Sequence, residues 1–257
     1  MSADSLALLL KAFRLPTMAG MYERVVQEAE QQGWGYCKFL QHLCEAEAQD
    51  RAERKLERLL KQSGLPAGKS LGNLEEAKLP AKVRRVLPSL LDGGFVTRAE
   101  NVIAMGLPGR GKSHFLAALG RELILRHKYS VLFTPTFKLV QQLLAAKRDL
   151  GLEKLLRQFD HFDVVILDDL GYVQQGREEM EVLFTFLAER YERRSVLLSS
   201  NLVFSKWDQI FKDPMTTMAA IDRLVHHALI LEFNGESLRV PRDKEKEKDK
   251  DKEKGGG

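Results

Sequence analysis

The chain has 257 residues, of which 44% are hydrophobic and 30% charged, and its formal net charge is +4. This length allows one sizeable core with a smaller satellite domain, and the composition excludes a disordered chain. Two cysteines, Cys37 and Cys44, exclude a disulfide framework and a cysteine-rich zinc cluster. The longest early apolar run, at 6–10, is too short to cross a membrane, so we expect a cytoplasmic protein with no membrane partner.

Residues 1–66 predict a small all-α domain. Apolar residues recur there at helical spacing, and a charged stretch, EAEAQDRAERKLER at 45–58, is expected as a charged face of a long helix. Gly64 and Pro66 end that helix. We expect this domain to serve in oligomerisation or partner docking. Residues 67–98, with scattered prolines and glycines, are expected as a linker with a short helix of its own.

Strands and helices alternate in residues 99–241, which we expect to form one nucleotide-binding domain. Short apolar runs stand at 101–105, 130–134, 163–168, 195–200 and 228–233, with amphipathic helical patterns between them. Strands that are apolar on both faces and separated by helices predict a parallel five-stranded sheet flanked by helices. Residues 242–257 alternate acids and lysines and are expected as a disordered charged tail.

The segment GLPGRGKS at 106–113 fits the pattern Gly-x4-Gly-Lys-Ser of a phosphate-binding loop, and it follows an apolar strand and precedes a helix. Glycines let backbone N–H groups turn toward a pyrophosphate, Lys112 reaches the β- and γ-phosphates, and Ser113 offers its hydroxyl to Mg²⁺. No guanine-reading Asn-Lys-x-Asp sequence occurs, so ATP and Mg²⁺ are the expected cofactors. The expected nucleotide contacts are Gly106, Leu107, Pro108, Gly109, Arg110, Gly111, Lys112, Ser113 and His114.

Polar residues end two further predicted strands. Asp168 and Asp169 follow the apolar run at 164–167, at the strand end where ligands bind in an open α/β sheet. Asp168 is expected to hold Mg²⁺ through water and Asp169 to act as general base. Asn201 ends the strand at 195–200. If that strand lies between the other two, Asn201 points at the γ-phosphate or the attacking water.

Arg223 lies on a predicted helix just before the last strand. Assembling NTPases use such an arginine to neutralise transition-state charge on a neighbour's nucleotide, so Arg223 is a candidate for this role in trans. His226 and His227 follow and are interpreted as helix-end histidines rather than metal ligands.

These motifs, taken together, give the chain a family likeness. It resembles the IstB family, the AAA+ ATPase helpers of insertion-sequence transposition, which are related to DnaC-type helicase loaders. The likeness runs from about Leu8 to Arg239. Its segments are KAFRLPTMAGMYERVVQEAEQQGWGYCKFLQHLCEAEAQDRAERKLERLLKQSGLP, GGFVTRAENVIAMGLPGRGKSHFLAALG, VVILDDLGY, LLSSN, DRLVHHA and FNGESLR.

The resemblance implies an AAA+ P-loop fold without a C-terminal lid, in a protein of the bacterial cytosol or nucleoid. It also implies an ATP-dependent homo-oligomer, a ring or spiral on double-stranded DNA, that remodels the DNA and stimulates an IstA-type transposase. Lys112 and Ser113 match the family's P-loop and Arg223 its arginine finger. By the same match, Asp168 and Asp169 are its metal and catalytic acids, and Asn201 its sensor. Phe95 falls where the adenine is expected to lodge.

The resemblance assigns no role to two further arginines. Arg110 departs from the small or apolar residue of many relatives, and Arg239 matches a family position without an assigned role. No segment is a basic arm, so DNA contacts are expected from patches that an oligomer brings together, mostly to the phosphate backbone. The candidate basic residues are Lys138, Lys147, Arg148, Arg190, Arg193 and Arg194, with Arg84 and Arg85 in the linker.

Two other functions remain open on the sequence. A replicative helicase loader would be built on the same ATPase, although two cysteines cannot build the four-cysteine zinc site that some loaders carry. A monomeric small-molecule P-loop kinase would need an acceptor lid, which is not evident after the third strand. A switch that binds ATP without turnover is disfavoured by the two acids at 168–169.

Overall fold

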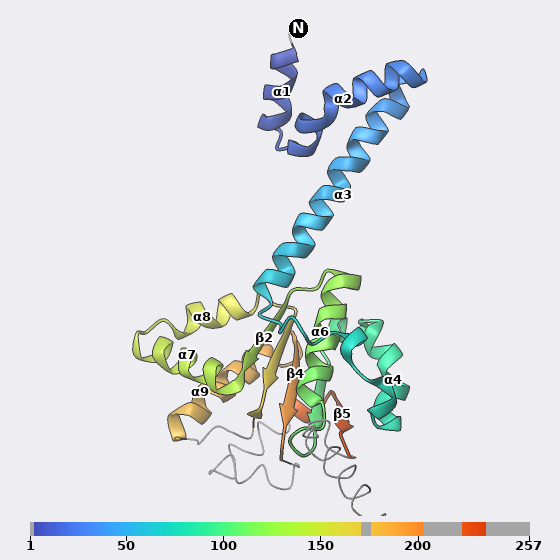
Figure 1. Ribbon diagram of the computed structural model, residues 1–257. Coiled ribbons are helices and arrows are strands. Elements are labelled where there is room, and N and C mark those ends of the chain that lie inside the picture. Colours follow the sequence, from blue (N-terminus) through green and yellow to red (C-terminus); the bar gives the residue numbers. More distant parts are fainter. Residues whose placement is uncertain (1–2, 171–175, 203–222, 235–257) are drawn as a thin grey trace, which may run out of the picture. The chain divides into compact units, whose positions relative to one another are not determined.

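The computed structural model describes residues 3–170, 176–202 and 223–234 (Figure 1). Arg239 and the charged tail lie outside the described residues. The chain divides into two compact units, Met1–Leu59 and Leu60–Gly257, and the division falls inside one continuous helix. The two units are described separately below.

The first unit is helical, as its apolar spacing predicts. It contains α1 (Ala3–Ala12), α2 (Pro16–Gln32) and most of α3 (Tyr36–Gln62). α2 ends at Gly33, whose φ of 63° is left-handed, a conformation that glycine adopts without steric cost. A small core closes the unit, and its buried residues are Met18, Tyr22, Val25 and Leu43.

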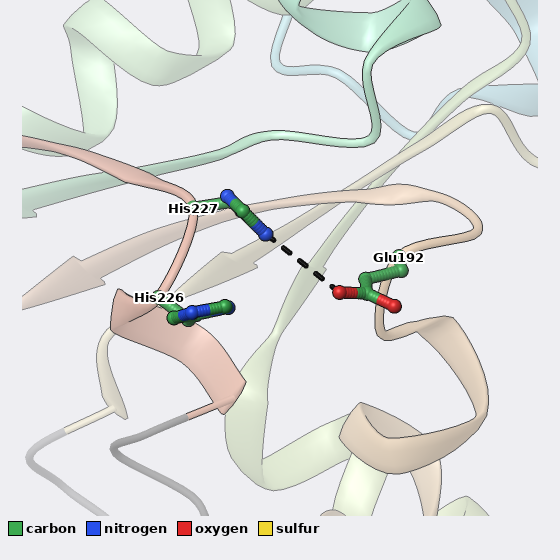
Figure 2. A group of neighbouring side chains, drawn as sticks. All are labelled: Glu192, His226 and His227. Atoms are coloured by element: carbon green, nitrogen blue, oxygen red, sulfur yellow. Dashed lines mark ion pairs between the residues drawn. The ribbon is translucent and has the colours of Figure 1, made fainter.

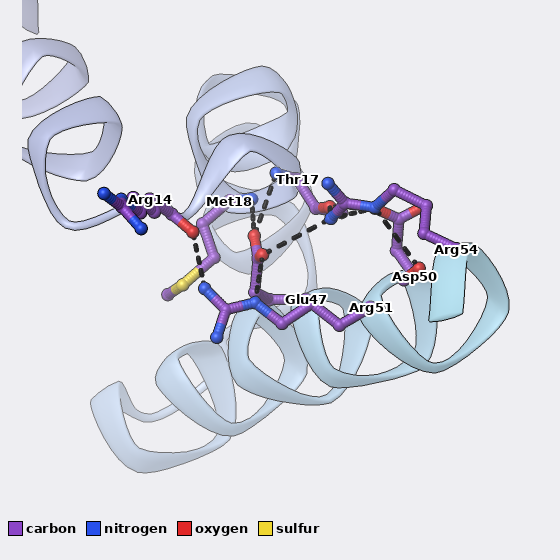
Figure 3. Close-up of polar contacts among 7 residues, drawn as sticks. All are labelled: Arg14, Thr17, Met18, Glu47, Asp50, Arg51 and Arg54. Carbon is purple, nitrogen blue, oxygen red and sulfur yellow. Dashed lines mark hydrogen bonds and ion pairs between the residues drawn. The ribbon is translucent and has the colours of Figure 1, made fainter. Parts of the chain in front are cut away.

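A buried carboxylate joins α3 to the start of α2 (Figure 3). Glu47 is 4% exposed and accepts hydrogen bonds from the backbone N–H groups of Thr17 (2.9 Å) and Met18 (3.1 Å). These N–H groups belong to the first turn of α2 and have no partner within the helix, so Glu47 caps α2 from a distance. Arg51 donates to the same carboxylate at 2.9 Å. Glu47 is therefore a structural residue of this unit.

Glu47→Gln is expected to lower the free energy of unfolding of the first unit by about 1–3 kcal/mol, because an amide loses the charge-assisted bonds. Burial alone would raise the pKa of Glu47, but the hydrogen bonds from Met18, Arg51 and Thr17 outweigh it and hold the pKa below the ordinary 4.5. The stabilisation is thus complete above that value and is lost as the pH falls below it.

Thermal unfolding followed by circular dichroism, at neutral pH and below pH 4.5, tests this expectation. Glu45→Gln is the matched control, because Glu45 is exposed on the same helix and pairs only with Gln41 in the described contacts. A Glu47→Gln protein that melts like the control at neutral pH would contradict the capping role.

Residues 67–98 belong to the larger unit. They form the short helices η1 (Leu71–Asn73) and η2 (Glu76–Lys78), then α4 (Ala81–Leu91) and α5 (Gly94–Thr97). Two histidines of α6 (Lys112–His127) contact this segment: His114 Nε2 lies 3.1 Å from the Ser70 carbonyl oxygen and His127 Nε2 lies 2.8 Å from that of Leu91. The segment expected as a linker therefore packs on the helix that follows the P-loop.

Five parallel strands form the sheet of the larger unit, as the sequence predicts. They are β1 (Asn101–Met105), β2 (Val131–Pro135), β3 (Val164–Asp168), β4 (Ser195–Ser200) and β5 (Ala228–Glu232), in the order β2-β3-β4-β1-β5. The register pairs Val102 with Leu197 and Val165 with Val196. β4 therefore lies between the strands that carry the P-loop and the two aspartates.

Helices cover both faces of this sheet. Val165 and Leu167 of β3 pack in one core with α7 (Thr136–Arg148) and α9 (Arg177–Arg190), beside α8 (Leu152–Phe159). Ile166, which points the other way, meets α6 at Gly120, where an added Cβ would lie 2.6 Å from the Ile166 side chain. This two-sided burial explains the uniformly apolar strands.

Candidate nucleotide-binding site

The candidate site lies at the carboxyl ends of β1, β3 and β4. Lys112, the first residue of α6, is 5% exposed. Its ammonium donates hydrogen bonds to the carbonyl oxygens of Gly106 (2.7 Å) and Leu107 (3.0 Å) and to Asn201 Oδ1 (2.7 Å). The buried charge is thus held by the loop itself and by the residue that ends β4.

The loop conformation requires its glycines. Gly106, Gly109 and Gly111 have φ values of 147°, 81° and 86°, which side chains rarely adopt. Gly106 is also sterically closed, because an added Cβ would lie 2.5 Å from the Phe233 carbonyl oxygen. The chain after β5 is fixed against the loop by a bond from Phe233 N to Met105 O (2.7 Å). Phe233 was not recognised from the sequence.

Gly106→Ala is therefore expected to displace the loop and to lower the free energy of unfolding by about 2 kcal/mol or more. The clash is with backbone, which cannot move aside as a flexible side chain would. Denaturant unfolding measures the loss. Gly68→Ala is the control, because Gly68 is exposed in the same unit with no atom within 4 Å of the added Cβ. Equal stability of the two variants would show that the loop tolerates a side chain.

The two aspartates make different contacts. Asp168 Oδ1 accepts a hydrogen bond from Ser199 Oγ at 2.6 Å. Asp169 Oδ1 accepts one from Asn201 Nδ2 at 2.7 Å, while its backbone N–H donates to Ser199 Oγ at 2.8 Å. Asp169 has a φ of 65°, a strained conformation for a side-chain residue. Ser199 was not recognised from the sequence, although hydroxyl residues at a strand end are a weak signal for such a contact.

Asn201 connects the P-loop with the end of β3, where the two aspartates lie. Its oxygen accepts from Lys112 and its nitrogen donates to Asp169, so one amide bridges the P-loop lysine and the second aspartate. The condition set for the role of Asn201, that β4 lies between β1 and β3, is met by the strand order. The structure thus brings together Lys112, Asn201 and Asp169, and places Asp168 beside them through Ser199.

The other residues predicted to contact the nucleotide differ in how far they are exposed. Ser113 is half-buried in the first turn of α6, and so is His114, whose Nε2 lies 3.1 Å from the Ser70 carbonyl oxygen. Arg110 Nη1 is buried without a hydrogen-bond partner among the described residues. Phe95 is 5% exposed, so its ring offers little surface to a base. Gly109 and Gly111 are half-buried, whereas Leu107 and Pro108 are exposed.

The donor set fits Mg²⁺. The Ser113 hydroxyl and the Asp168 carboxylate are both half-buried oxygen donors, and this hard cation prefers oxygen ligands with several waters retained. Asp168 keeps one oxygen engaged by Ser199, which orients the carboxylate. These residues are the ones that would hold the ion with a bound nucleotide.

One candidate DNA contact is wrong. Arg190 is 2% exposed, and its guanidinium donates to the carbonyl oxygens of Phe159 (3.0 Å), Phe162 (2.9 Å) and Ser195 (3.1 Å). Burial lowers the pKa of Arg190 to about 10. Arg190 therefore ties the end of α9 to α8 and β4, and a phosphate cannot reach it.

The other basic candidates are accessible to different degrees. Arg193 and Arg194 pair with Asp160 (2.5 Å) and Asp163 (2.7 Å), and Lys147 pairs with Glu181 (2.9 Å). These acidic partners offset the positive charges of the three basic residues. Arg193 is nevertheless exposed, and so are Lys138 and Arg148 on α7 and Arg84 and Arg85 on α4.

Arg223 lies far from the P-loop of its own chain. It is exposed on the helical turn that leads into β5, so it stands at the amino end of the parallel sheet. Lys112 and the aspartates stand at the carboxyl end. The structure does not bring Arg223 into the site of its own chain.

Comparison with known proteins agrees with this geometry. The sequence profile of the family described as IstB-like ATP binding protein matches residues 8–247. An inferred insertion-sequence ATP-binding protein of Sinorhizobium fredii, y4iQ/y4nD/y4sD, is 40% identical over 91% of this chain and 78% of its own length. The inferred ATP-binding protein of insertion sequence IS21 from Pseudomonas aeruginosa is 36% identical over 93% and 90%.

Solved structures confirm the fold. DnaI matches with a TM-score of 0.55 at 20% identity, covering 67% of this chain and 96% of its own. The replication initiator DnaA, solved with AMPPCP and single-stranded DNA, matches with a TM-score of 0.56 at 19% identity, covering 73% and 56%. In the part of the chain that the structure describes, no helix is long and apolar enough to cross a membrane. The architecture is that of the AAA+ P-loop proteins, and the chain belongs to the family of IstB-like ATP binding proteins.

Proposed function

We propose that this chain is an ATP-hydrolysing enzyme that oligomerises on duplex DNA, remodels it and stimulates the transposase of its insertion sequence. The bridge from Lys112 through Asn201 to Asp169 carries the proposal, because it sets a phosphate-binding cation, a polar sensor and a carboxylate in one contiguous network. The relatives named as insertion-sequence proteins supply the transposition setting.

Each residue of the site would have a separate role in ATP hydrolysis. Lys112 exchanges the carbonyl oxygens of Gly106 and Leu107 for β- and γ-phosphate oxygens. Ser113 and Asp168 would hold Mg²⁺, which neutralises charge that develops on the phosphates. Asn201 orients the attacking water. Asp169 accepts the proton of that water as its oxygen bonds to the γ-phosphorus and the bond to ADP breaks.

Arg223 would complete the site of a neighbouring subunit, since it lies at the end of the sheet opposite its own P-loop. Arg223→Ala is expected to slow DNA-stimulated hydrolysis by roughly 1,000-fold. Mixing it with Lys112→Ala should restore part of the activity, because the second protein supplies Arg223 to the intact P-loop of the first. Steady-state ADP release of each variant and of the mixture measures this.

Arg157→Ala is the control, since Arg157 is an exposed arginine that pairs with Glu153 on its own helix. No recovery in any mixing ratio would place Arg223 outside the nucleotide site of a neighbour.

DNA binding would follow from assembly. The exposed Lys138 and Arg148 lie on α7, and repetition around an oligomer would place such pairs along a continuous path for the phosphate backbone. Binding would then weaken steeply with salt, because each phosphate contact releases counterions. Lys138→Ala with Arg148→Ala should reduce the salt slope without a change in sequence preference.

The experiment that tests this function combines the purified chain with duplex DNA, its transposase and either ATP or ADP. Assembly on DNA and enhanced strand transfer only with ATP support the proposal. Capture of a replicative helicase in place of the transposase would favour the helicase-loader alternative. Phosphorylation of a small molecule by a monomer would favour the kinase alternative.

A further inference from the structure

A cluster of three ligating side chains lies on the second unit, away from the nucleotide site (Figure 2). It consists of Glu192, after α9, and His226 and His227, before β5. One donor atom from each side chain lies within 4.8 Å of the others, and His227 Nε2 is 3.7 Å from Glu192 Oε1. All three residues are exposed, so an ion and its water ligands have access.

The backbone beneath the cluster is held in place. The buried Asn101, at the start of β1, donates from its backbone N–H to the His227 carbonyl oxygen (2.8 Å) and from its side chain to that of Leu224 (3.1 Å). Its side-chain oxygen accepts from Val196 N (2.9 Å) in β4. One asparagine therefore fixes the segment that carries both histidines to the sheet.

Neighbouring groups orient the side chains. The Tyr191 oxygen lies 2.9 Å from His226 Nδ1, and in the tautomer that donates from Nδ1–H to this oxygen, Nε2 carries the lone pair that a metal would bind. The two imidazole rings lie with centroids 4.3 Å apart. Glu192 has a φ of 55°, an uncommon conformation for a residue with a side chain.

Two imidazoles and a carboxylate form a donor set typical of zinc and related metals. Ligand atoms about 2.0–2.1 Å from a tetrahedral zinc lie about 3.4 Å from one another. The donor atoms, which lie within 4.8 Å of one another, would therefore approach by at most about 1.4 Å, which exposed side chains can do by rotation. We propose that Glu192, His226 and His227 bind one divalent transition-metal ion, with water in the remaining position.

A bound ion would tie the end of α9 to the segment before β5. That segment begins with Arg223 in the described chain, three residues before His226. If Arg223 acts on a neighbour's nucleotide, as proposed above, the ion would limit its movement. This consequence rests on the proposed function, whereas metal binding is measured without nucleotide and stands or falls separately.

The direct test is a titration of the untagged full-length chain with Zn²⁺ against a colorimetric zinc indicator, with Co²⁺ as a second probe. Cys37 and Cys44 are exposed thiols in the first unit, so both are changed to serine to remove the competing ligands. We expect one ion per chain. We also expect the visible Co²⁺ absorption of a four-coordinate site.

Glu192→Gln, His226→Ala and His227→Ala should each weaken Zn²⁺ binding at least about tenfold, and Tyr191→Phe by a similar factor through loss of the orienting bond. His161→Ala is the matched control, since His161 is an exposed histidine outside the cluster. Unchanged affinity in the His227→Ala protein, or an equal loss in the control, would overturn the proposal. So would a Co²⁺ spectrum identical to that of the aqueous ion.

Discussion

Lys112→Ala should reduce ATP hydrolysis by roughly 100-fold or more while leaving the fold intact. The Lys112 ammonium donates hydrogen bonds both to the carbonyl oxygens of the P-loop and to the Asn201 side chain. Alanine removes the positive charge that would meet the β- and γ-phosphates. It also frees the Asn201 oxygen from its ammonium partner, so the Asn201 amide loses a contact that orients it.

Steady-state ADP release measures the loss, and nucleotide affinity is followed separately with a fluorescent ATP analogue. Lys154→Ala is the matched control, since Lys154 is exposed on α8, away from the site. Lys112→Met keeps the aliphatic length and should be as inactive as alanine. Activity in the methionine variant would mean that packing, rather than charge, is what Lys112 provides.

Asp169→Asn should slow hydrolysis by about 100- to 10,000-fold with little change in ATP affinity. An amide cannot accept the proton of the attacking water. It also places N–H groups where Asn201 Nδ2 now donates to Asp169 Oδ1, so the bond to the sensor is weakened. The combination of lost turnover and retained binding distinguishes a general base from a residue that holds the nucleotide.

Single-turnover hydrolysis with the variant in excess over ATP separates the chemical step from product release. Asp149→Asn, at the exposed end of α7, is the control. If Asp169→Asn hydrolysed ATP at the normal single-turnover rate, the proton would have to leave by another route. Asp168 would then be the better candidate for the base.

The position of the loop between β1 and α6 and the residues at the strand ends could be predicted from the sequence because their signals are local. GLPGRGKS contains the glycines whose positive φ values the loop requires, and the apolar strands before Asp168 and Asn201 fix both residues at one edge of the sheet. Parallel pairing alone then brings them together. Five strands flanked by helices follow from the same alternation of apolar runs.

Residues whose role depends on distant contacts could not be predicted. Glu47 lies in a charged stretch, which is usually exposed to solvent. Its side chain is nevertheless buried, because its carboxylate accepts hydrogen bonds from the N–H groups of Thr17 and Met18 in the first turn of α2. Arginine is usually a surface residue, and no local pattern indicates that Arg190 is buried. The carbonyl oxygens that accept hydrogen bonds from its guanidinium belong to α8 and β4. No local pattern records either set of partners.

The contact of Phe233 with Gly106 has the same character. Gly106 is identified from the sequence as a loop glycine, but the reason that no side chain fits is the chain after β5. The Glu192 cluster likewise needs the turn after α9 beside the segment before β5. Such contacts appear only when the sheet order is known.

The most direct test of the account is ATP hydrolysis by the wild-type chain with and without duplex DNA, with particle size recorded by light scattering in the same samples. Lys112→Ala serves as the blank. If the chain acts as proposed, hydrolysis depends on DNA and large assemblies form only with ATP and DNA together. A monomer that hydrolyses ATP equally well without DNA would contradict it.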